Sequence, residues 1–345
     1  MKKIKIGISI GDINGIGMEV IIKTFVDNRM LDFCTPIVYG SAKLAAIHRK
    51  ALGINDFSFN KIKSISEANP KKANLIDCWE EDVEIAFGEA NAEGGKYALL
   101  SLEHASKDLF DGNIDALVTA PINKDNIQGE SFNFPGHTEY LTDKFEGESL
   151  MLMVSDNLKI GVATNHIPLS EVSKSLSADS IFSKLKILKN SLVKDFACTS
   201  PRIAVLGLNP HAGDNGLLGK EEEEIIIPAI NNAKSIGINA FGPYSADGFF
   251  GSGNYQKFDA ILAMYHDQGL IPFKSLSFGE GVNFTAGLNV TRTSPDHGVA
   301  YEIAGKNVAS ESSFRAAIYM ACDIHKNRKI NEEITEDPLK VKRVD

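Results

Sequence analysis

Cysteine is scarce in this chain of 345 residues, and no two cysteines lie close together in the sequence. The four are Cys34, Cys78, Cys198 and Cys322, and they form no C-x-x-C pair. This spacing argues against a disulfide framework and against a zinc site built from thiolates. We expect all four to be reduced thiols without a catalytic role.

Long apolar runs are also missing, since no stretch approaches the roughly 18 residues that a membrane-spanning helix needs. The basic start, Met1–Ile6, turns directly into a strand-like pattern without the apolar core or cleavage site of a signal peptide. The net charge of -9 disfavours a nucleic-acid partner, because phosphate binding draws on clustered Lys and Arg. We therefore expect a cytoplasmic protein that binds neither membranes nor nucleic acid.

The common nucleotide-binding loops are absent as well. The first glycine-rich segment, Gly11–Gly17, has the spacing G-x-x-x-G-x-G, which differs from the dinucleotide fingerprint G-x-G-x-x-G. The pair Gly219-Lys220 is followed by Glu221, so it does not complete a Walker sequence. If a nucleotide binds, it binds without these loops.

The residues that are present describe an ordinary soluble protein, with 43% hydrophobic and 23% charged residues. The length suits two domains, or one large α/β unit divided by a cleft. Strand-like and helical patterns alternate from the start, which predicts a mostly parallel sheet covered by helices. The first four segments are a strand at Ile4–Ile10, a helix at Gly17–Leu31, a strand at Pro36–Tyr39 and a helix at Ala42–Leu52.

Later segments add one antiparallel element. Leu150–Val154 and Leu158–Thr164 flank Asp156-Asn157 and predict a hairpin. Ser170–Phe196 has apolar residues at helical spacing and predicts one amphipathic helix. The acidic run Lys220–Glu224 suits the first turn of a helix, where it complements the helix dipole. We expect the charged tail Lys326–Asp345 to be a surface arm that contributes little.

The run Phe258–Gly269 is the stretch around which the chain is organised, because its apolar part ends abruptly in His266-Asp267. Two upstream runs have the same design, and they end in His166 and His211. Parallel buried strands of this kind deliver their last side chains to the edge of the sheet where α/β enzymes place their chemistry. Three imidazoles with an open fourth position make a catalytic site for a divalent metal, although each histidine alone could be a structural hydrogen-bonding residue.

The other five histidines divide into two groups. His48, His104 and His325 fall within helical patterns, where a packed or solvated side chain is the simple interpretation. His137 and His297 follow apolar or strand-like stretches and are candidates for a site. Thr138 is either a substrate contact or the N-cap of a helix through Tyr140–Phe145.

Charged residues accompany the strand-end histidines. Asp247 and Asp267 could orient the imidazoles or complete a coordination shell, whereas for Asp214 we prefer an exposed loop carboxylate. Cationic and amide side chains downstream in a Gly-rich loop region would suit an anionic substrate, although scattered surface charge explains them equally well. They are Lys274, Asn283 and Arg292. Lys124, after the apolar run Ile114–Asn123, is either a surface charge or a substrate contact.

Six ordered motifs resemble those of the 4-hydroxythreonine-4-phosphate dehydrogenase family of vitamin B6 (pyridoxal phosphate) biosynthesis, over about residues 4 to 320. One departure is that the family usually has prolines at the positions of Ile13 and Met18, which affects the shape of the first loop. The motifs are Gly11-Asp12 with Gly15–Gly17 and Glu19, Thr119–Pro121 with Lys124, Pro135–Glu139, Leu208–Gly213, Met264–Gly269, and Arg292–Ser294 with Asp296–Gly298.

The resemblance implies a two-domain α/β/α fold like that of isocitrate and isopropylmalate dehydrogenases, with the active site in the cleft between the domains. We place residues 1–130 with 270–345 in the first domain, on the cofactor side, and 131–269 in the second, with the metal ligands and the dimer interface. The resemblance also implies a homodimer whose subunits share the active site. The substrate would be a small phosphorylated amino acid.

The same resemblance implies roles for individual residues. His166, His211 and His266 would hold a divalent metal (Zn, Mg or Co), with one ligand from the partner subunit. Substrate would contact the set His137, Thr138, Lys274, Asn283 and Arg292. Asp247 and Asp267 are the catalytic candidates.

The implied reaction is NAD- or NADP-dependent oxidation and decarboxylation of 4-phosphohydroxy-L-threonine to 3-amino-1-hydroxyacetone 1-phosphate. Related dehydrogenases of this kind oxidise phosphorylated sugar acids or dihydrodiols. A zinc hydrolase is an alternative from a different class, and an acyltransferase of the same fold is a third that the strand-end histidines disfavour.

Overall fold

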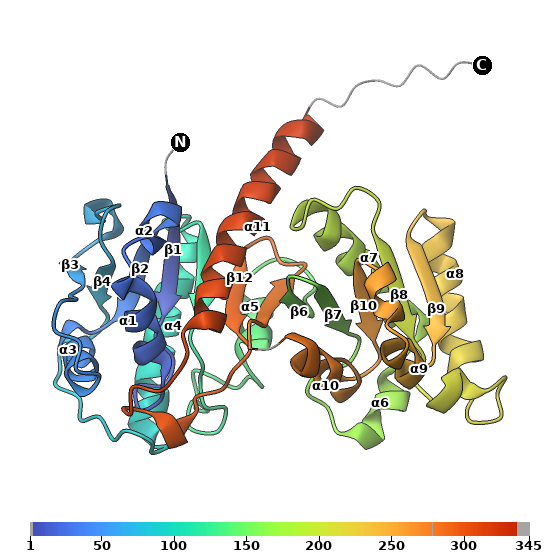
Figure 1. Ribbon diagram of the computed structural model, residues 1–345, viewed down its shortest axis with the longest axis horizontal. Coiled ribbons are helices and arrows are strands. Elements are labelled where there is room, and N and C mark those ends of the chain that lie inside the picture. The colour runs from blue at the N-terminus through green and yellow to red at the C-terminus, as the bar shows by residue number, and fades with distance from the viewer. Residues whose placement is uncertain (1–2, 278, 337–345) are drawn as a thin grey trace.

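The structure is a computed structural model that describes residues 3–277 and 279–336 (Figure 1). Twelve strands form one sheet in the order β3-β4-β2-β1-β5-β12-β11-β6-β7-β10-β8-β9. The strands are β1 Ile4–Ser9, β2 Cys34–Gly40, β3 Asn60–Ile62, β4 Asn74–Asp77, β5 Ala116–Thr119, β6 Leu150–Ser155, β7 Leu158–Val162, β8 Arg202–Leu206, β9 Asn239–Tyr244, β10 Ala260–Ala263, β11 Val282–Ala286 and β12 Arg292–Pro295.

Helices cover both faces of this sheet (Figure 1). They are α1 Gly17–Val26, α2 Met30–Phe33, α3 Ala42–Ala51, α4 Ala92–Phe110, α5 His137–Lys144, α6 Leu169–Ser175, α7 Ala178–Lys194, α8 Ile227–Ser235, α9 Ala246–Gly251, α10 His266–Ser277 and α11 Ser312–Glu336. The predicted mostly parallel α/β architecture with an antiparallel element is confirmed, because eight strand pairs are parallel and only β12-β11, β11-β6 and β6-β7 are antiparallel.

The strands are apolar on both sides because each side meets a helix layer. In β6, Leu152 packs in the core shared with α7 and α8, whereas its neighbour Met153 packs with α10 on the opposite face. In β2, Val38 belongs to the core with α1 and α11, and Tyr39 to the core with α4. Alternation of this kind follows from the two-residue period of a strand.

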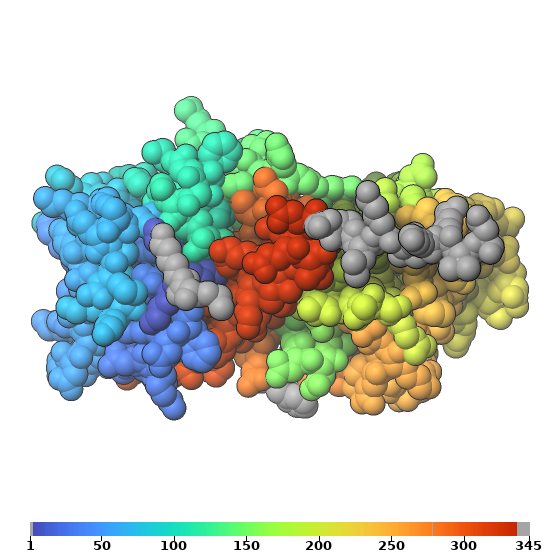
Figure 2. Space-filling model, turned by 90° about the horizontal axis from the view of Figure 1, so that it is seen from above, coloured from blue at the N-terminus to red at the C-terminus, as the bar shows by residue number. Residues whose placement is uncertain are grey.

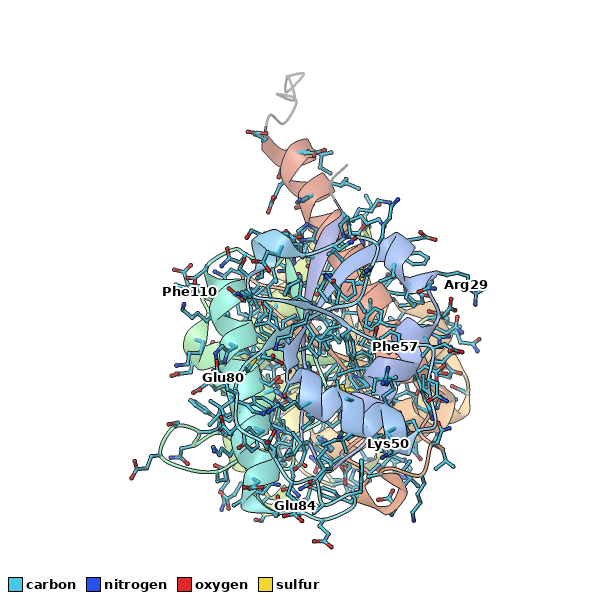
Figure 3. All side chains as sticks on the ribbon, turned by 90° about the vertical axis from the view of Figure 1, so that its left-hand side faces the viewer. Arg29, Lys50, Phe57, Glu80, Glu84 and Phe110 are labelled. Carbon is cyan, nitrogen blue, oxygen red and sulfur yellow. The ribbon has the colours of Figure 1, made fainter. Side chains whose placement is uncertain are left out.

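The N-terminal and C-terminal segments combine in one half of the molecule. β12 pairs with β5, and α11 packs against β12, β5 and β11. Seen from above, α11 lies between the blue N-terminal part and the yellow and orange part of the chain (Figure 2). At the outer end of the first half, the charged side chains of Arg29, Lys50 and Glu84 reach solvent (Figure 3). The predicted division into 1–130 with 270–345 and 131–269 stays a prediction, and its cut at 269–270 lies within α10.

Two predicted helices are each broken in the structure. The helix predicted at Gly17–Leu31 ends at Val26, because the carboxylate of Asp27 accepts hydrogen bonds from the backbone N–H and side chain of Arg29 and closes a local turn. The single helix predicted at Ser170–Phe196 is two helices, α6 and α7. Ser177 begins the second one, since its hydroxyl accepts from the N–H of Ser180 in a reciprocal capping box.

The expected surface arm at the C-terminus is wrong for its start, where Asn327 and Arg328 are packed, whereas 329–336 are mostly exposed. α11 continues to Glu336, and 337–345 lie outside the described residues. Arg328 Nε donates to the buried carboxylate of Asp195 over 2.6 Å, and Asn327 donates to its backbone carbonyl. These contacts tie this part of the helix to the residue that follows α7, so the charged sequence is helical and is anchored at Asn327 and Arg328.

Two absences concern the described residues. Within 3–277 and 279–336, no helix is both long and apolar enough to cross a membrane. All four cysteines are free thiols, as the sequence predicts.

Candidate active site

Three neighbouring strands carry the three strand-end histidines. β10 pairs in parallel with β7 on one side and with β8 on the other. His166 follows β7, His211 follows β8, and His266 is the first residue of α10, so it begins a helix and does not lie in a loop. Because parallel neighbours end at the same edge of a sheet, all three histidines emerge along one edge.

Side-chain hydrogen bonds hold the ends of these strands together. Thr164 Oγ1 donates to the carbonyl of Met264 over 2.8 Å and joins the segment after β7 to that after β10. Gln268 accepts from Met264 N over 2.7 Å and donates to the carbonyl of Gly207 over 2.6 Å, which joins β10 to β8. A Cβ at Gly269 would lie 2.9 Å from a side chain of β7, so this glycine lets α10 pack closely.

His166 and His266 lie beside each other, with ring centroids 5.7 Å apart. The Nδ1 of His266 is 2.7 Å from a carboxylate oxygen of Asp267, and the Nδ1 of His166 is 3.4 Å from one of Glu139. A carboxylate that accepts the Nδ1 proton leaves the lone pair of Nε2 free for a metal ion. This donor set fits a divalent metal bound by imidazole nitrogens.

Lys124 contacts Nε2 of His166, the ring nitrogen that does not face Glu139. Its Nζ lies 3.2 Å from Nε2 of His166. An ammonium group can only donate, so this nitrogen accepts and the Nδ1 proton of His166 faces Glu139. The position of Lys124, which the sequence left open between a surface charge and a substrate contact, is therefore in the site.

His211 lies in a tight turn, Pro210–Gly213, and has a left-handed backbone conformation with φ 53°. The pKa of the nearby Asp247 is lowered, first by the hydrogen bond from the hydroxyl of Ser245 and to a smaller extent by the charge of His211. Among residues 3–277 and 279–336, no group of three or more His, Cys, Asp or Glu is placed to hold a metal. The predicted three-histidine set stays a prediction.

Glu222 shapes the turn that carries His211. It is buried, and its carboxylate accepts hydrogen bonds from the N–H groups of Leu208 and Asn209, each over 2.8 Å, and from the Asn209 side chain. The predicted place of the acidic run at a helix start is confirmed, because Glu222, Glu223 and Glu224 stand in the first turn of a π-helical segment. Glu222 has the additional role of binding a neighbouring loop. Sequence proximity to the helix start hid this long-range role.

A cleft of about 210 Å³ opens beside His166, between the loop after β5, the start of α5, β6, α10 and β11. Its cationic lining residues are Lys124, Lys274 and Arg292, and its acidic ones are Glu139 and Asp296. The excess of positive charge favours an anionic ligand. Six of the ten predicted site residues line the cleft: His137, Thr138, His166, Lys274, Asn283 and Arg292.

Arg292 lies at the bottom of this cleft and is 2% exposed. Its guanidinium donates to the hydroxyl of Thr119 over 2.7 and 3.1 Å and to that of Thr285 over 3.2 Å. Burial lowers the pKa of Arg292 to about 9, and the charge of Glu139 opposes this effect. A buried cation held only by hydroxyls within the described residues is prepared for an anion, because buried charges are normally paired.

Two further lining residues have unused hydrogen-bonding atoms. Burial, and then the positive charges of Arg292 and Lys124, hold the pKa of His137 well below its usual range, so the ring is neutral. Its Nε2 and the Oδ1 of Asn283 are buried without a partner in the described part of the chain. Such unsatisfied atoms are rare in folded proteins and mark a place where a polar ligand binds.

The predicted surroundings of several site residues need correction. Lys274 belongs to α10, Asn283 to β11 and Arg292 to β12, so they do not lie in a Gly-rich loop region. Thr138 is not the N-cap of α5, because that helix starts at His137 and has no side-chain cap. The sequence missed this because Pro135–Glu139 contains several polar residues that can begin a helix.

The acidic lining residues Glu139 and Asp296 were not predicted as site residues, whereas the candidate His297 does line the cleft. The Nδ1 of His297 is 3.0 Å from the Gly298 carbonyl, which leaves its buried Nε2 as an acceptor without a partner among the described residues. Both Glu139 and His297 stand within motifs that the sequence singled out, and that was the available signal.

The glycine-rich segment Gly11–Gly17 is a packing junction. Its Asp12 accepts a hydrogen bond from the hydroxyl of Tyr301 over 2.7 Å, and a Cβ at Gly15 would overlap Val299. The glycines therefore allow close packing against protein atoms.

The two residues that stand where prolines are expected in this first loop are buried in the core. Ile13 and Met18 are each 1% exposed. The carbonyl of Ile13 accepts a hydrogen bond from Nε2 of His48, 2.9 Å away, and this bond anchors the loop to α3. Ile13 and Met18 are thus accommodated by burial of their side chains in the core.

Comparison with known proteins shows similarity along most of the sequence. The sequence profile of the pyridoxal phosphate biosynthetic protein PdxA family matches residues 32–321. A 4-hydroxythreonine-4-phosphate dehydrogenase of Bacteroides thetaiotaomicron is 52% identical over 340 residues, which are 98% of this chain and 93% of that protein. The chain belongs to the PdxA family.

Solved structures place the PdxA chain in the same fold as its relatives. The crystal structure of a 4-hydroxythreonine-4-phosphate dehydrogenase from Klebsiella pneumoniae superposes with a TM-score of 0.79 at 33% identity, covering 94% of this chain and 98% of that one. An isocitrate dehydrogenase from Methylococcus capsulatus has a TM-score of 0.50 at 13% identity, covering 96% and 90%. The second likeness concerns the fold alone, and it confirms the predicted architecture.

Proposed function

We propose that this PdxA-family protein is a divalent-metal-dependent dehydrogenase that uses NAD or NADP. It oxidises and decarboxylates 4-phosphohydroxy-L-threonine to 3-amino-1-hydroxyacetone 1-phosphate, the reaction that the name of its 52% identical relative implies. The observation that carries the proposal is the cleft in which the buried Arg292, bound within the described residues only to hydroxyl groups, lies with His166. The ring of His166 is in turn 5.7 Å from that of His266. The predicted cytoplasmic location stays a prediction.

The cleft residues bind and orient the substrate. Arg292 presents a planar fork that suits a phosphate or carboxylate group, and Lys274 adds a second positive charge from α10. The Nε2 of neutral His137 and the Oδ1 of Asn283 are satisfied when a polar ligand fills the cleft. Thr138 lines the same wall beside them.

The metal would be zinc, magnesium or cobalt, held by His166, His211 and His266. Such an ion lowers the pKa of a bound hydroxyl group and stabilises the negative charge that develops as carbon dioxide leaves. Asp267 fixes the ring of His266 by accepting its Nδ1 proton. Asp247 interacts with His211 through charge, since His211 contributes to the lowered pKa of Asp247. NAD or NADP would accept the hydride.

A second copy of the chain completes the site. The described residues of one chain bring His166 and His266 together but form no three-ligand cluster. Large apolar side chains that follow the three histidines are exposed, and an exposed apolar surface of this kind suits an interface. They are Ile167, Leu169, Leu217, Leu218 and Ile271.

One assay tests the proposal. Purified protein with a divalent metal, NAD+ and 4-phosphohydroxy-L-threonine should produce NADH, seen as rising absorbance, and both a chelator and His211→Ala should abolish it. Loss of substrate without NADH would support a zinc hydrolase instead. A fully active His211→Ala protein would contradict the proposed role of His211 as a metal ligand.

The same assay separates the related substrates. Phosphorylated sugar acids and dihydrodiols, offered in place of phosphohydroxythreonine, should give lower kcat/KM. A dihydrodiol lacks an anionic phosphate for Arg292 and Lys274, so it should be the poorest of the three. An acyltransferase would show neither NADH formation nor dependence on metal.

A further inference from the structure

Lys124 occupies the nitrogen of His166 that a metal needs. Its Nζ lies 3.2 Å from Nε2, whereas Nδ1 of the same ring faces Glu139. The Nε2 lone pair is therefore already used by an ammonium proton. A metal ion requires that lone pair, because a ligating imidazole must offer a free nitrogen.

The ammonium group and a divalent cation exclude each other at this position. Both are positively charged, and both would stand on the same side of the His166 ring. Two like charges cannot both occupy the space in front of one nitrogen, and at a separation of a few ångströms they also repel each other, although water reaches both exposed side chains and weakens this repulsion. Metal binding must therefore move the end of Lys124 away from the ring.

The cleft provides the place to which this ammonium group moves. Lys124 lines the cleft together with Arg292 and Lys274, and its Cε passes 3.9 Å from the Cβ position of Gly136, directly before His137. A lysine head on a flexible four-carbon stem can turn without movement of the backbone. On leaving His166, it faces the wall that carries the other cations.

We propose that Lys124 is an exchange residue, which occupies His166 in the metal-free protein and moves onto the anionic part of the substrate when metal binds. This inference rests on the proposed metal-dependent function. The movement of Lys124 makes metal binding and anion binding mutually favourable. The metal displaces the ammonium group of Lys124 from His166, and the anion then binds that ammonium group. By linkage, the anion increases metal affinity by the same factor.

Zinc affinity of the full-length protein provides the first test, measured by competition with a chromogenic chelator. Lys124→Met keeps most of the stem but removes the charge, and we expect it to bind zinc about tenfold more tightly than the unmodified protein. Damage to the fold would weaken zinc binding, so a gain in affinity cannot come from misfolding. Lys124→Arg, which keeps the charge, should bind zinc no more tightly than the unmodified protein.

Two matched controls distinguish the direct contact of Lys124 with His166 from a general effect of removing positive charge. Lys63→Met removes an exposed lysine beside β3, at the far edge of the sheet, and should leave zinc affinity unchanged. Lys274→Met removes a cleft cation that has no recorded contact with His166, and it should change zinc affinity by less than about threefold. An equal gain in Lys274→Met would show that Lys124 acts only through general charge and would overturn the exchange.

The second test measures the coupling between zinc binding and substrate binding. Binding of 4-phosphohydroxy-L-threonine by calorimetry should tighten about tenfold when zinc is added to the unmodified protein, and clearly less in Lys124→Met. Unchanged zinc affinity in Lys124→Met would overturn the exchange while NADH formation by the unmodified protein left the proposed function intact. Failure of the unmodified protein to bind zinc or any other divalent metal would overturn both.

Discussion

Arg292 is a charged side chain that the fold buries against two hydroxyl groups, Thr119 and Thr285. Leaving a cation in such a place costs free energy unless a ligand pairs with it. The neutral ring of His137 and the amide oxygen of Asn283 are likewise unsatisfied among the described residues. At the scale of single residues, the cleft thus holds several polar groups whose partners are to be supplied by substrate.

Replacing Arg292 by lysine tests this view. Lys keeps the charge but cannot donate to both hydroxyls and to an anion in one plane. We expect kcat/KM to fall about a hundredfold, mainly through KM, since a hydrogen bond to a charged group contributes about 1.5–3 kcal/mol. Steady-state kinetics with 4-phosphohydroxy-L-threonine measure this. Arg315→Lys, on α11 outside the cleft, is the control, and equal effects in both would contradict the role of Arg292.

His48 makes stability depend on pH. Burial lowers its pKa to about 4 from the ordinary 6.5, and the hydrogen bond to Ile13 opposes this effect only in part. Because the unfolded chain takes up a proton that the folded ring refuses, the contribution of His48 is complete above about pH 6.5 and is lost as the pH falls towards 4.

Chemical denaturation of His48→Gln at pH 7 and pH 4.5 measures that loss. We expect the unmodified protein to lose about 2–3 kcal/mol more free energy of unfolding than the variant over this interval. His104→Gln, whose side chain is exposed on α4, should lose as much as the unmodified protein. If His48→Gln loses as much stability as this control, the conclusion that His48 is buried and neutral is wrong.

At the scale of elements, the site depends on how closely α10 packs on β7. Gly269 lies in the first turn of α10, where a Cβ would be 2.9 Å from Ile160 and 3.1 Å from Val162. His266 begins the same helix, so the packing of this turn sets its position relative to His166. The bridge that Gln268 makes between β10 and β8 acts in the same way on the edge beside His211.

Gly269→Ala should push the first turn of α10 away from β7. We expect a loss of about 1–3 kcal/mol in the free energy of unfolding, because extra atoms in a close-packed contact force the helix to shift. Zinc affinity should fall at the same time. Gly251→Ala in α9 is the matched control, since a Cβ there meets no atom within 4 Å. Equal stability of the two variants by urea denaturation would contradict the close approach.

The whole molecule joins two groups of strands in one sheet and places the cleft near their junction, with β11, β12 and α11 connecting them. His166 and His266 lie at this junction, whereas His211 lies on a turn of its own after β8. At this scale, the proposed second copy would complete the histidine set and cover the exposed apolar side chains that follow the three histidines.

Mixing two inactive variants tests the shared site. His211→Ala and His266→Ala should each be inactive alone, but after mixed refolding about a quarter of the activity should return. This value follows because half of the dimers are mixed and one of their two sites carries a full set of ligands. If one chain supplied all three histidines, the mixture would stay inactive. Size-exclusion chromatography of each variant confirms that both still form dimers.

Much of this protein could be predicted from local sequence. The apolar runs before His166, His211 and His266 determine buried strands and place a histidine after each, because a strand buried on both faces needs continuous apolar residues. The Asp156-Asn157 turn likewise determines the hairpin of β6 and β7. The motifs around them identified the family and most of the residues that line the cleft.

Other features were decided only by tertiary structure. Glu222 is a loop-binding carboxylate because Leu208 and Asn209 reach it from another segment, and no local pattern contains that contact. Arg328 in the charged part of α11 is partly buried because its guanidinium reaches the carboxylate of Asp195 from another helix. The contact between Lys124 and His166 is also decided by tertiary packing, since 42 residues separate the two in the chain. Periodicity records which face of an element is buried, whereas partners distant in sequence are chosen only when the elements pack together.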